Sequence, residues 1–246
     1  MTEEDRRDTI RRKLANMQAR RSSPAIPTGF RVLDTVLGVG GLPRGRIVEW
    51  FGPPACGKTT LALQTAAHVQ RSGLVAAWID ADRTFDPGYA VALGVALDRL
   101  PVVRPESTEE AMEMARQLLE SRGVDLLVLD SAAALTPSLE LGSGLSDSIF
   151  SLQGRVLVSG LRKICLPLRR SEAAAVFLNQ DRVRIEGAGE TSAGGPALKL
   201  CAPVRLALEA GNGPGLRLRA LRNHAAAAFE SGVLAWRQEG GFTDPL

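Results

Sequence analysis

The chain has 246 residues, of which 45% are hydrophobic, enough to bury the core of one soluble α/β unit, and its formal net charge of +3 excludes a polycation. Two histidines argue against a histidine-based zinc centre, and no apolar run is long enough to span a membrane. Three cysteines without C-x-x-C spacing, and a charged N-terminus where a signal peptide would be apolar, predict a cytoplasmic protein.

The N-terminal segment is basic. Residues 1–24 carry seven basic side chains against four acidic ones, a surplus that equals the net charge of the whole chain. Ile10, Leu14 and Met17 stand at helical spacing before a proline-containing stretch. We predict a basic amphipathic helix and linker over residues 1–27, followed by a core domain over 28–246. The helix covers its own domain, or it docks on a neighbouring subunit or on DNA; both interpretations stay open.

Apolar runs of strand length alternate with helical patterns through most of the chain. The predicted strands are 46–51, 74–79, 101–104, 124–129 and 173–178, and the predicted helices are 58–71, 87–94, 108–121 and 148–165. Near-continuous apolar strands alternating with helices are typical of a mostly parallel sheet covered on both faces. After about residue 203 short strands follow one another, which predicts antiparallel additions at a sheet edge.

A glycine-rich segment between the first of these strands and the first of these helices has the spelling G-x-x-x-x-G-K-T. Its members are Gly52, Pro53, Pro54, Ala55, Cys56, Gly57, Lys58 and Thr59, with Thr60 adjoining. Glycines let the backbone curl around an anion, so that N–H groups and the positive helix terminus point at phosphates. Lys58 adds a charge for the β and γ oxygens, and the Thr59 hydroxyl ligates Mg²⁺. We therefore predict a phosphate site for ATP with Mg²⁺ rather than a glycine turn without ligand.

Carboxylates follow two of the other predicted strands. Asp130 ends the apolar run 126–129, and downstream of a phosphate loop we assign it to the magnesium shell, although such an aspartate is elsewhere usually a turn or cap residue. Asp80 and Asp82 end another strand, two residues apart. One of them is positioned to orient an attacking water.

Several stretches together resemble the bacterial RecA family. They are residues 40–43, 52–59, 86–89, 130–137, 177–180 and 194–199. The resemblance extends from about residue 26 to 242. It implies a RecA-type P-loop NTPase with a mostly parallel central sheet flanked by helices and antiparallel strands at the C-terminal end, with ATP and Mg²⁺ as cofactors.

The resemblance also implies roles for individual residues. Asp86 and Tyr89 match the positions that contact the adenine, with the tyrosine ring stacked on the base. Gln180 matches the residue that senses the γ-phosphate, and together with Lys58 and Asp82 it completes the implied catalytic set. The two DNA-binding loops of the family correspond to about residues 139–151 and 181–195.

Basic residues gather where the resemblance implies DNA. Between positions 155 and 184 they are Arg155, Arg162, Lys163, Arg169, Arg170, Arg182 and Arg184. Such an excess suits a phosphate backbone, although a charge run is more often a solvated face. Gly194 and Gly195 leave backbone amides accessible as further phosphate donors. Because aromatic residues make up only 4%, we predict sequence-tolerant binding of single-stranded DNA rather than recognition by base stacking.

The chain also departs from the family pattern. Asp82 stands where the family has its catalytic glutamate and is one methylene shorter, so we predict slow hydrolysis, at most a weak DNA-dependent ATPase. Arg222 and His224 replace two lysines that reach the ATP of a neighbouring subunit. Arg222 keeps the charge, whereas His224 lacks the permanent charge of a lysine. The second DNA loop is about three residues shorter, and the separate C-terminal domain has no counterpart before Leu246.

Two functions remain open from these observations. In the first, the protein forms filaments on single-stranded DNA and acts in recombination, repair and the SOS response to damage. In the second, it is an accessory similar to the ImuA proteins, which associates with RecA or a translesion polymerase without efficient strand exchange. A third class, a P-loop kinase for small molecules, leaves the matches at Gln180, Gly194 and Gly195 unexplained.

Overall fold

The computed structural model describes residues 24–142, 150–182, 191–192, 197–211, 213, 215–228, 230–237 and 240–245. The predicted N-terminal helix lies outside these residues. So do most of the first DNA loop, at 143–149, and most of the second, at 183–190 and 193–196. Within the second loop, Arg184, Gly194 and Gly195 therefore lie outside the described chain. No described helix has both the length and the apolar character needed to cross a membrane.

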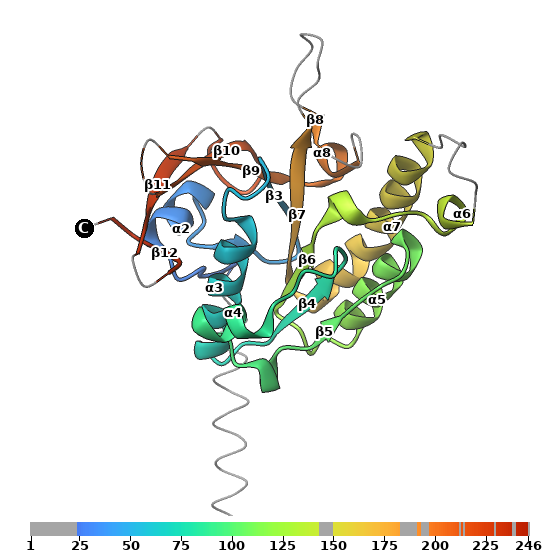
Figure 1. The fold of residues 1–246 in the computed structure, drawn as a ribbon, viewed down its shortest axis with the longest axis horizontal. Helices are drawn as coiled ribbons and strands as arrows, with labels where there is room; N and C mark the ends of the chain where they lie inside the picture. The colour runs from blue at the N-terminus through green and yellow to red at the C-terminus, as the bar shows by residue number, and fades with distance from the viewer. Residues whose placement is uncertain are drawn as a thin grey trace, which may run out of the picture.

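The described chain is organised around one large mixed sheet (Figure 1), with the strand order β12-β11-β10-β9-β3-β7-β6-β4-β5 and β8 paired to β7. The strands are β3 (Ile47–Gly52), β4 (Ala76–Asp80), β5 (Val102–Val103), β6 (Leu126–Asp130), β7 (Ala174–Arg182), β8 (Thr191–Ser192), β9 (Val204–Ala210), β10 (Gly215–Asn223), β11 (Ser231–Trp236) and β12 (Phe242–Thr243). The strands from β9 to β5 in this order pair in parallel, and β10, β11 and β12 add antiparallel strands at one edge. The predicted fold class is confirmed.

Antiparallel pairing begins one strand later than the sequence suggested. β9 pairs in parallel with β3 and antiparallel with β10. A short helix, α8 (Ala197–Cys201), lies between β7 and β9, so the chain crosses over before it re-enters the sheet. A strand entered through such a crossover runs parallel to the strand it left.

Helices cover both faces of the sheet. They are α2 (Arg31–Leu37), α3 (Lys58–Arg71), α4 (Pro87–Ala92), α5 (Thr108–Glu120), α6 (Ser138–Leu141), α7 (Phe150–Ser171) and α8, with 3₁₀ turns at Leu97–Arg99 and Ala132–Ala134. A separate two-stranded sheet pairs β1 (Ala25–Ile26) with β2 (Leu42–Pro43), so the last residues of the predicted linker are part of the described fold. The sequence patterns did not predict α2, α8, β1 or β12.

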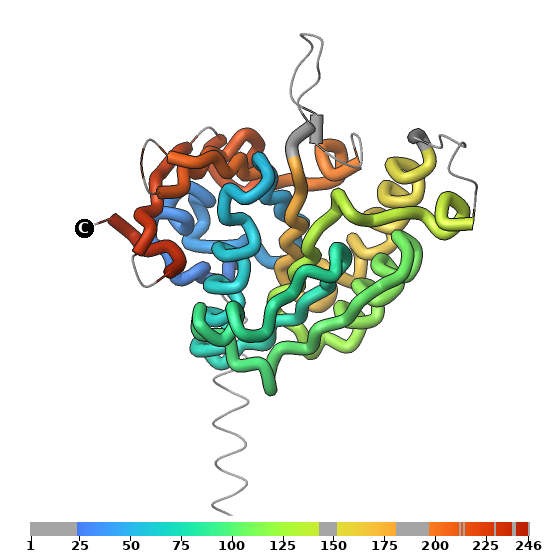
Figure 2. The backbone as a smooth tube through the Cα atoms, viewed as in Figure 1, coloured from blue at the N-terminus to red at the C-terminus, as the bar shows by residue number. Residues whose placement is uncertain are grey.

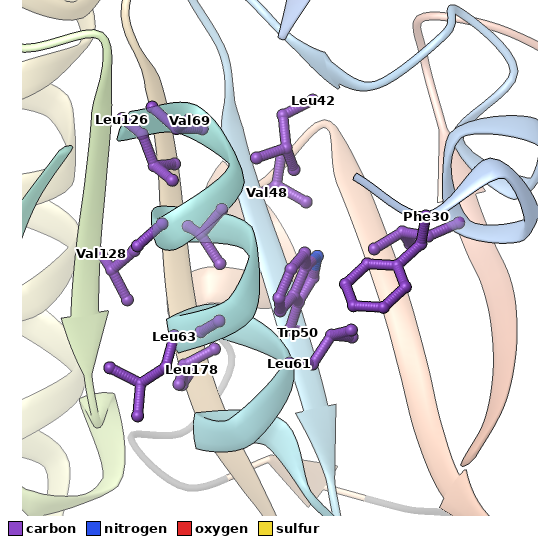
Figure 3. Close-up of a cluster of buried hydrophobic side chains, with 14 of the residues drawn as sticks. Phe30, Leu42, Val48, Trp50, Leu61, Leu63, Val69, Leu126, Val128 and Leu178 are labelled. Carbon is purple, nitrogen blue, oxygen red and sulfur yellow. The ribbon is translucent and has the colours of Figure 1, made fainter. Parts of the chain in front are cut away.

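Alternation along the strands divides the core into two clusters. Side chains of successive strand residues point to opposite faces. Val48, Trp50 and Val128 therefore join the cluster beneath α2 and α3, whereas Ile47, Leu127 and Leu129 join the cluster beneath α5, α7 and α8. Figure 3 shows Trp50 beside the ring of Phe30, which immediately precedes α2, with Leu61 of α3 close to both rings. The strand pattern in the sequence thus fixes where both helix layers pack.

Helix α7 is longer than predicted because its buried face continues past residue 165. Leu161, Ile164 and Leu168 stand at helical spacing and are all fully or almost fully buried. Pro167 lies inside the helix and removes one backbone donor, a cost that this burial offsets. Gly160 brings α7 close to α5, since an added Cβ would lie 2.1 Å from the Met112 side chain.

Candidate nucleotide-binding site

The phosphate loop joins β3 to α3, as predicted. Gly57 precedes the helix in the left-handed conformation, at a φ of 99°, which favours glycine. The Lys58 ammonium is buried and donates hydrogen bonds to the carbonyl oxygens of Gly52, at 3.1 Å, and Pro53, at 2.6 Å. Both acceptors belong to the loop itself. These two hydrogen bonds therefore hold the Lys58 ammonium against the phosphate loop.

Thr59 and Asp130 meet at the mouth of this loop. The Thr59 hydroxyl donates to the Asp130 carboxylate at 2.8 Å. Burial raises the pKa of Asp130 to about 7, with a further increase from the charges of Asp82 and Asp80, while Thr59 and Lys58 oppose the rise. A divalent cation would relieve this burial of negative charge, and carboxylate and hydroxyl oxygens are ligands that Mg²⁺ accepts. The residues present therefore fit a magnesium ion.

The structure separates the two carboxylates that follow β4. Asp80 is buried and accepts hydrogen bonds from Arg104 Nε at 2.8 Å and from the backbone N–H groups of Thr84 and Phe85. Asp82 is partly exposed and accepts from the Thr84 hydroxyl at 2.7 Å. Its own N–H donates to the carbonyl of Asp130 at 3.3 Å. Asp80 thus stabilises the turn, and Asp82 remains the carboxylate available to a water molecule.

Asp86 and Tyr89 are also brought to the loop. The Asp86 side chain caps α4 by accepting from the N–H groups of Gly88 at 2.7 Å and Tyr89 at 3.1 Å. The Tyr89 hydroxyl lies 2.8 Å from the hydroxyl of Thr60, in the first turn of α3. The tyrosine ring is therefore tethered beside the phosphate loop while remaining partly exposed.

Gln180 lies next to the loop because of strand register. It pairs with Gly52 across β3 and β7, and its N–H donates to the side-chain oxygen of Asn179 at 2.9 Å. The Asn179 amide in turn donates to buried Glu49 at 2.8 Å. Arg205 Nε of β9 donates to the second oxygen of Glu49. A buried polar network therefore joins β7, β3 and β9 behind the predicted sensor.

Sequence reasoning missed Glu49 and Arg205. The only local signal was a charged residue inside the apolar strand run at 46–51. Such a residue is rarely buried without a partner, but nothing in the sequence identifies an arginine far along the chain as that partner. The Arg205 guanidinium also lies 4.5 Å from the centre of the Phe51 ring, a cation–π geometry.

Arg222 and His224 are not brought to the loop of their own chain. β10 ends at Asn223, whose partner Val204 pairs in turn with Val48 at the start of β3. The phosphate loop follows the opposite end of β3. Both residues therefore lie near the end of the parallel strands that is remote from the phosphate loop of their own chain.

The predicted DNA-binding residues of α7 form an exposed basic stripe. Arg155 and Arg162 are seven residues apart, which places them on one side of the helix, and Lys163 adjoins Arg162. All three are exposed. Arg182 ends β7, and only its backbone is described.

The fold and the site together define a P-loop protein with a mostly parallel sheet, in which the loop after β3, Asp130 at the end of β6 and Gln180 near the end of β7 lie at the carboxyl ends of the parallel strands. The RecA N-terminal domain family matches residues 8–214. The chain belongs to the RecA family.

Curated relatives agree with this assignment. Protein RecA of Methylococcus capsulatus is 43% identical over 231 residues, covering 89% of this chain and 67% of the relative. Protein RecA of Treponema denticola is 46% identical over 197 residues, covering 79% and 48%. Protein RecA of Parvibaculum lavamentivorans is 49% identical over 185 residues, covering 74% and 51%. The chain thus spans about half to two thirds of the length of these relatives.

Proposed function

We propose that this protein binds ATP with Mg²⁺ and single-stranded DNA, and acts in homologous recombination, repair and the response to DNA damage. The observation that carries the proposal is that the phosphate loop, Gln180 and Asp130 lie together at the carboxyl ends of the parallel strands. The phosphate loop begins at Gly52, Gln180 is its register partner, and Asp130 contacts Thr59 at 2.8 Å. This arrangement suits a triphosphate whose presence is relayed to the segment after β7.

Each residue of the site has a role in this proposal. The loop N–H groups and Lys58 hold the β and γ phosphates, and Thr59 with Asp130 would hold Mg²⁺. The bound ion supplies charge neutralisation for the phosphate oxygens. Asp82 orients the attacking water, and its short side chain makes hydrolysis slow. Asp86 and Tyr89 flank the adenine.

The basic stripe of α7 supports the DNA part of the proposal. Arg155, Arg162 and Lys163 are exposed together, as phosphate contacts require. Arg182, Arg184, Gly194 and Gly195 are proposed to continue this contact in the second loop. Because contacts of this kind release counterions, binding weakens steeply with salt and tolerates changes of sequence.

We also propose self-association into filaments, which the position of Arg222 and His224 supports. Both lie near the end of the parallel strands that is remote from the phosphate loop, so a second copy is needed for either to reach a nucleotide. Arg222 is proposed to act as the charge that approaches the neighbouring phosphates.

The alternative function is an accessory that associates with RecA or a translesion polymerase and exchanges strands poorly. Two residues favour it, since Asp82 has a shorter reach than glutamate and His224 replaces a permanent charge.

Light scattering and electron microscopy on single-stranded DNA with ATP test the choice between these functions. Ordered filaments of this protein alone would support the recombinase, whereas DNA association only with RecA or a polymerase present would support the accessory. The nucleotide site itself is tested by calorimetry with magnesium and adenine nucleotides, where the absence of any heat of binding would exclude both functions.

A further inference from the structure

An aromatic residue near the end of the chain packs against the phosphate loop. Phe242 of β12 is 4% exposed. A Cβ atom added to Gly57 would lie 2.5 Å from Phe242 Cζ and 2.8 Å from Cε2, and the three nearest atoms all belong to this ring. The ring therefore covers the Cα of the glycine that precedes Lys58. It occupies the space that any side chain at position 57 would need.

The backbone of Phe242 is fastened to α3 by a pair of hydrogen bonds. Its N–H donates to Gln64 Oε1 at 2.7 Å, and its carbonyl accepts from Gln64 Nε2 at 3.0 Å. Gln64 is buried, and Gly241 has a φ of 81° that lets the chain turn closely over this amide. The side chain of Gln64 thus pairs with β12 as a neighbouring strand would. Gln64 belongs to α3, the helix that follows the loop. Its hydrogen bonds to Phe242 therefore hold the ring over Gly57.

Two further contacts fix β12 from other directions. The Asp244 carboxylate accepts from the N–H groups of Arg31 and Val32, each at 2.8 Å, and so caps α2. Trp236 of β11 meets the Phe242 ring edge-on, with centroids 5.2 Å apart. In Figure 2 the C-terminal strands, in red, run beside α2, in blue. These contacts leave the ring little freedom to withdraw from the loop.

We propose that Phe242 is a positioning residue for the phosphate loop. Its ring holds Gly57 in the left-handed conformation, so that the loop N–H groups converge before a phosphate arrives. A loop that is already ordered binds its ligand without a further loss of conformational freedom. The inference rests on the proposed nucleotide site and names a residue outside the loop motif that determines the affinity of that site.

A matched pair of substitutions tests the proposal. Phe242→Ala removes the ring but keeps the backbone bonds to Gln64, and it is expected to lower the affinity for Mg²⁺-ADP and Mg²⁺-ATP about tenfold. Leu234→Ala truncates the fully buried side chain of β11, which is not among the groups nearest to Gly57, and is expected to leave affinity unchanged. Phe242→Leu is expected to restore most of the affinity. Calorimetry is performed at a temperature where thermal scans show every variant folded.

Equal loss of affinity in Phe242→Ala and Leu234→Ala, or no loss in Phe242→Ala, would overturn the proposal. Hydrogen exchange of the backbone amides of residues 55–59 without nucleotide provides a second readout, independent of ligand. Exchange is expected to accelerate in Phe242→Ala and not in Leu234→Ala; equal rates would overturn the positioning role. A wild-type protein that binds no nucleotide refutes the proposed function instead, while the exchange result still decides the role of Phe242.

Trp236 offers a spectroscopic check of the same contact. It is 42% exposed, whereas Trp50 and Trp78 are buried, so quenching of tryptophan fluorescence by acrylamide reports mainly on Trp236. Phe242→Ala is expected to increase this quenching in the absence of nucleotide, because the ring that packs against the indole is lost. Quenching equal to that of the wild type would contradict the packing of this ring against Trp236 and the loop.

Discussion

The parallel and antiparallel halves of the sheet contribute to the site in different ways. In the parallel half, β3 and β6 end at Gly52 and Asp130, β7 carries Gln180 near its end, and short motifs encode these residues of the proposed nucleotide site. In the antiparallel half, β10 and β12 carry side chains whose importance depends on what they meet across the fold, as Phe242 meets Gly57. The comparison shows that the residues of a phosphate loop are local in sequence, whereas the contacts that support the loop are not.

The largest expected effect lies within the parallel half, at the contact between Glu49 of β3 and Arg205 of β9. Arg205→Met leaves the buried Glu49 carboxylate without its cation, and unfolding free energy is expected to fall by about 3–5 kcal/mol. Urea denaturation measures the loss. The double variant Glu49→Gln with Arg205→Met removes both charges and should recover most of it. A double variant no more stable than Arg205→Met would show that packing, not charge, dominates this position.

A substitution confined to the parallel half should abolish ligand binding without unfolding the protein. Lys58→Ala is expected to weaken ATP binding by about 100-fold or more, about 3 kcal/mol, because a charged donor to the phosphates is lost. Calorimetry measures the affinity, and Arg71→Ala at the far end of α3 serves as the control. Unchanged ATP affinity in Lys58→Ala would discredit the phosphate assignment.

Changing the length of the Asp82 side chain is expected to alter the rate of ATP hydrolysis but not the affinity for ATP. Asp82→Glu adds one methylene and should raise the rate of ATP hydrolysis in the presence of DNA by about tenfold, with ATP affinity unchanged. Phosphate release assays measure the rate, and Asp82→Asn, which cannot accept the proton, should fall below wild type. A glutamate variant as slow as wild type would place the limiting step elsewhere.

The smallest expected effect concerns the helix on the other face of the sheet. Replacing Arg155 and Arg162 together by alanine should weaken single-stranded DNA binding and reduce the slope of log affinity against log salt by about 1.4, from two lost phosphate contacts. Fluorescence anisotropy over a salt series measures the slope, with Arg71→Ala as a control on the opposite face. An unaltered slope would mean that the stripe is only solvated surface.

Particular residues show how far the sequence could predict the site. The loop at 52–59 and Asp130 were predictable because each is defined by neighbours within a few positions, and the structure brings Thr59 and Asp130 into contact. The spacing of Asp80 and Asp82 left both open, and only the family resemblance selected Asp82; the structural reason is Arg104, which reaches Asp80 from beyond the neighbouring strand. The side-chain roles assigned at the second DNA loop lie outside the described residues and remain predictions.

The sequence by itself determined the alternation of strands and helices, the faces they bury and the spelling of the phosphate loop, because periodicity and backbone conformation are local properties. Only the tertiary structure decided that β9 runs parallel to β3, that Arg222 and His224 lie far from their own loop, and that Phe242 packs on Gly57. These features arise from contacts between residues far apart along the chain. Strand order and side-chain packing select such contacts together, and no short stretch of sequence contains them.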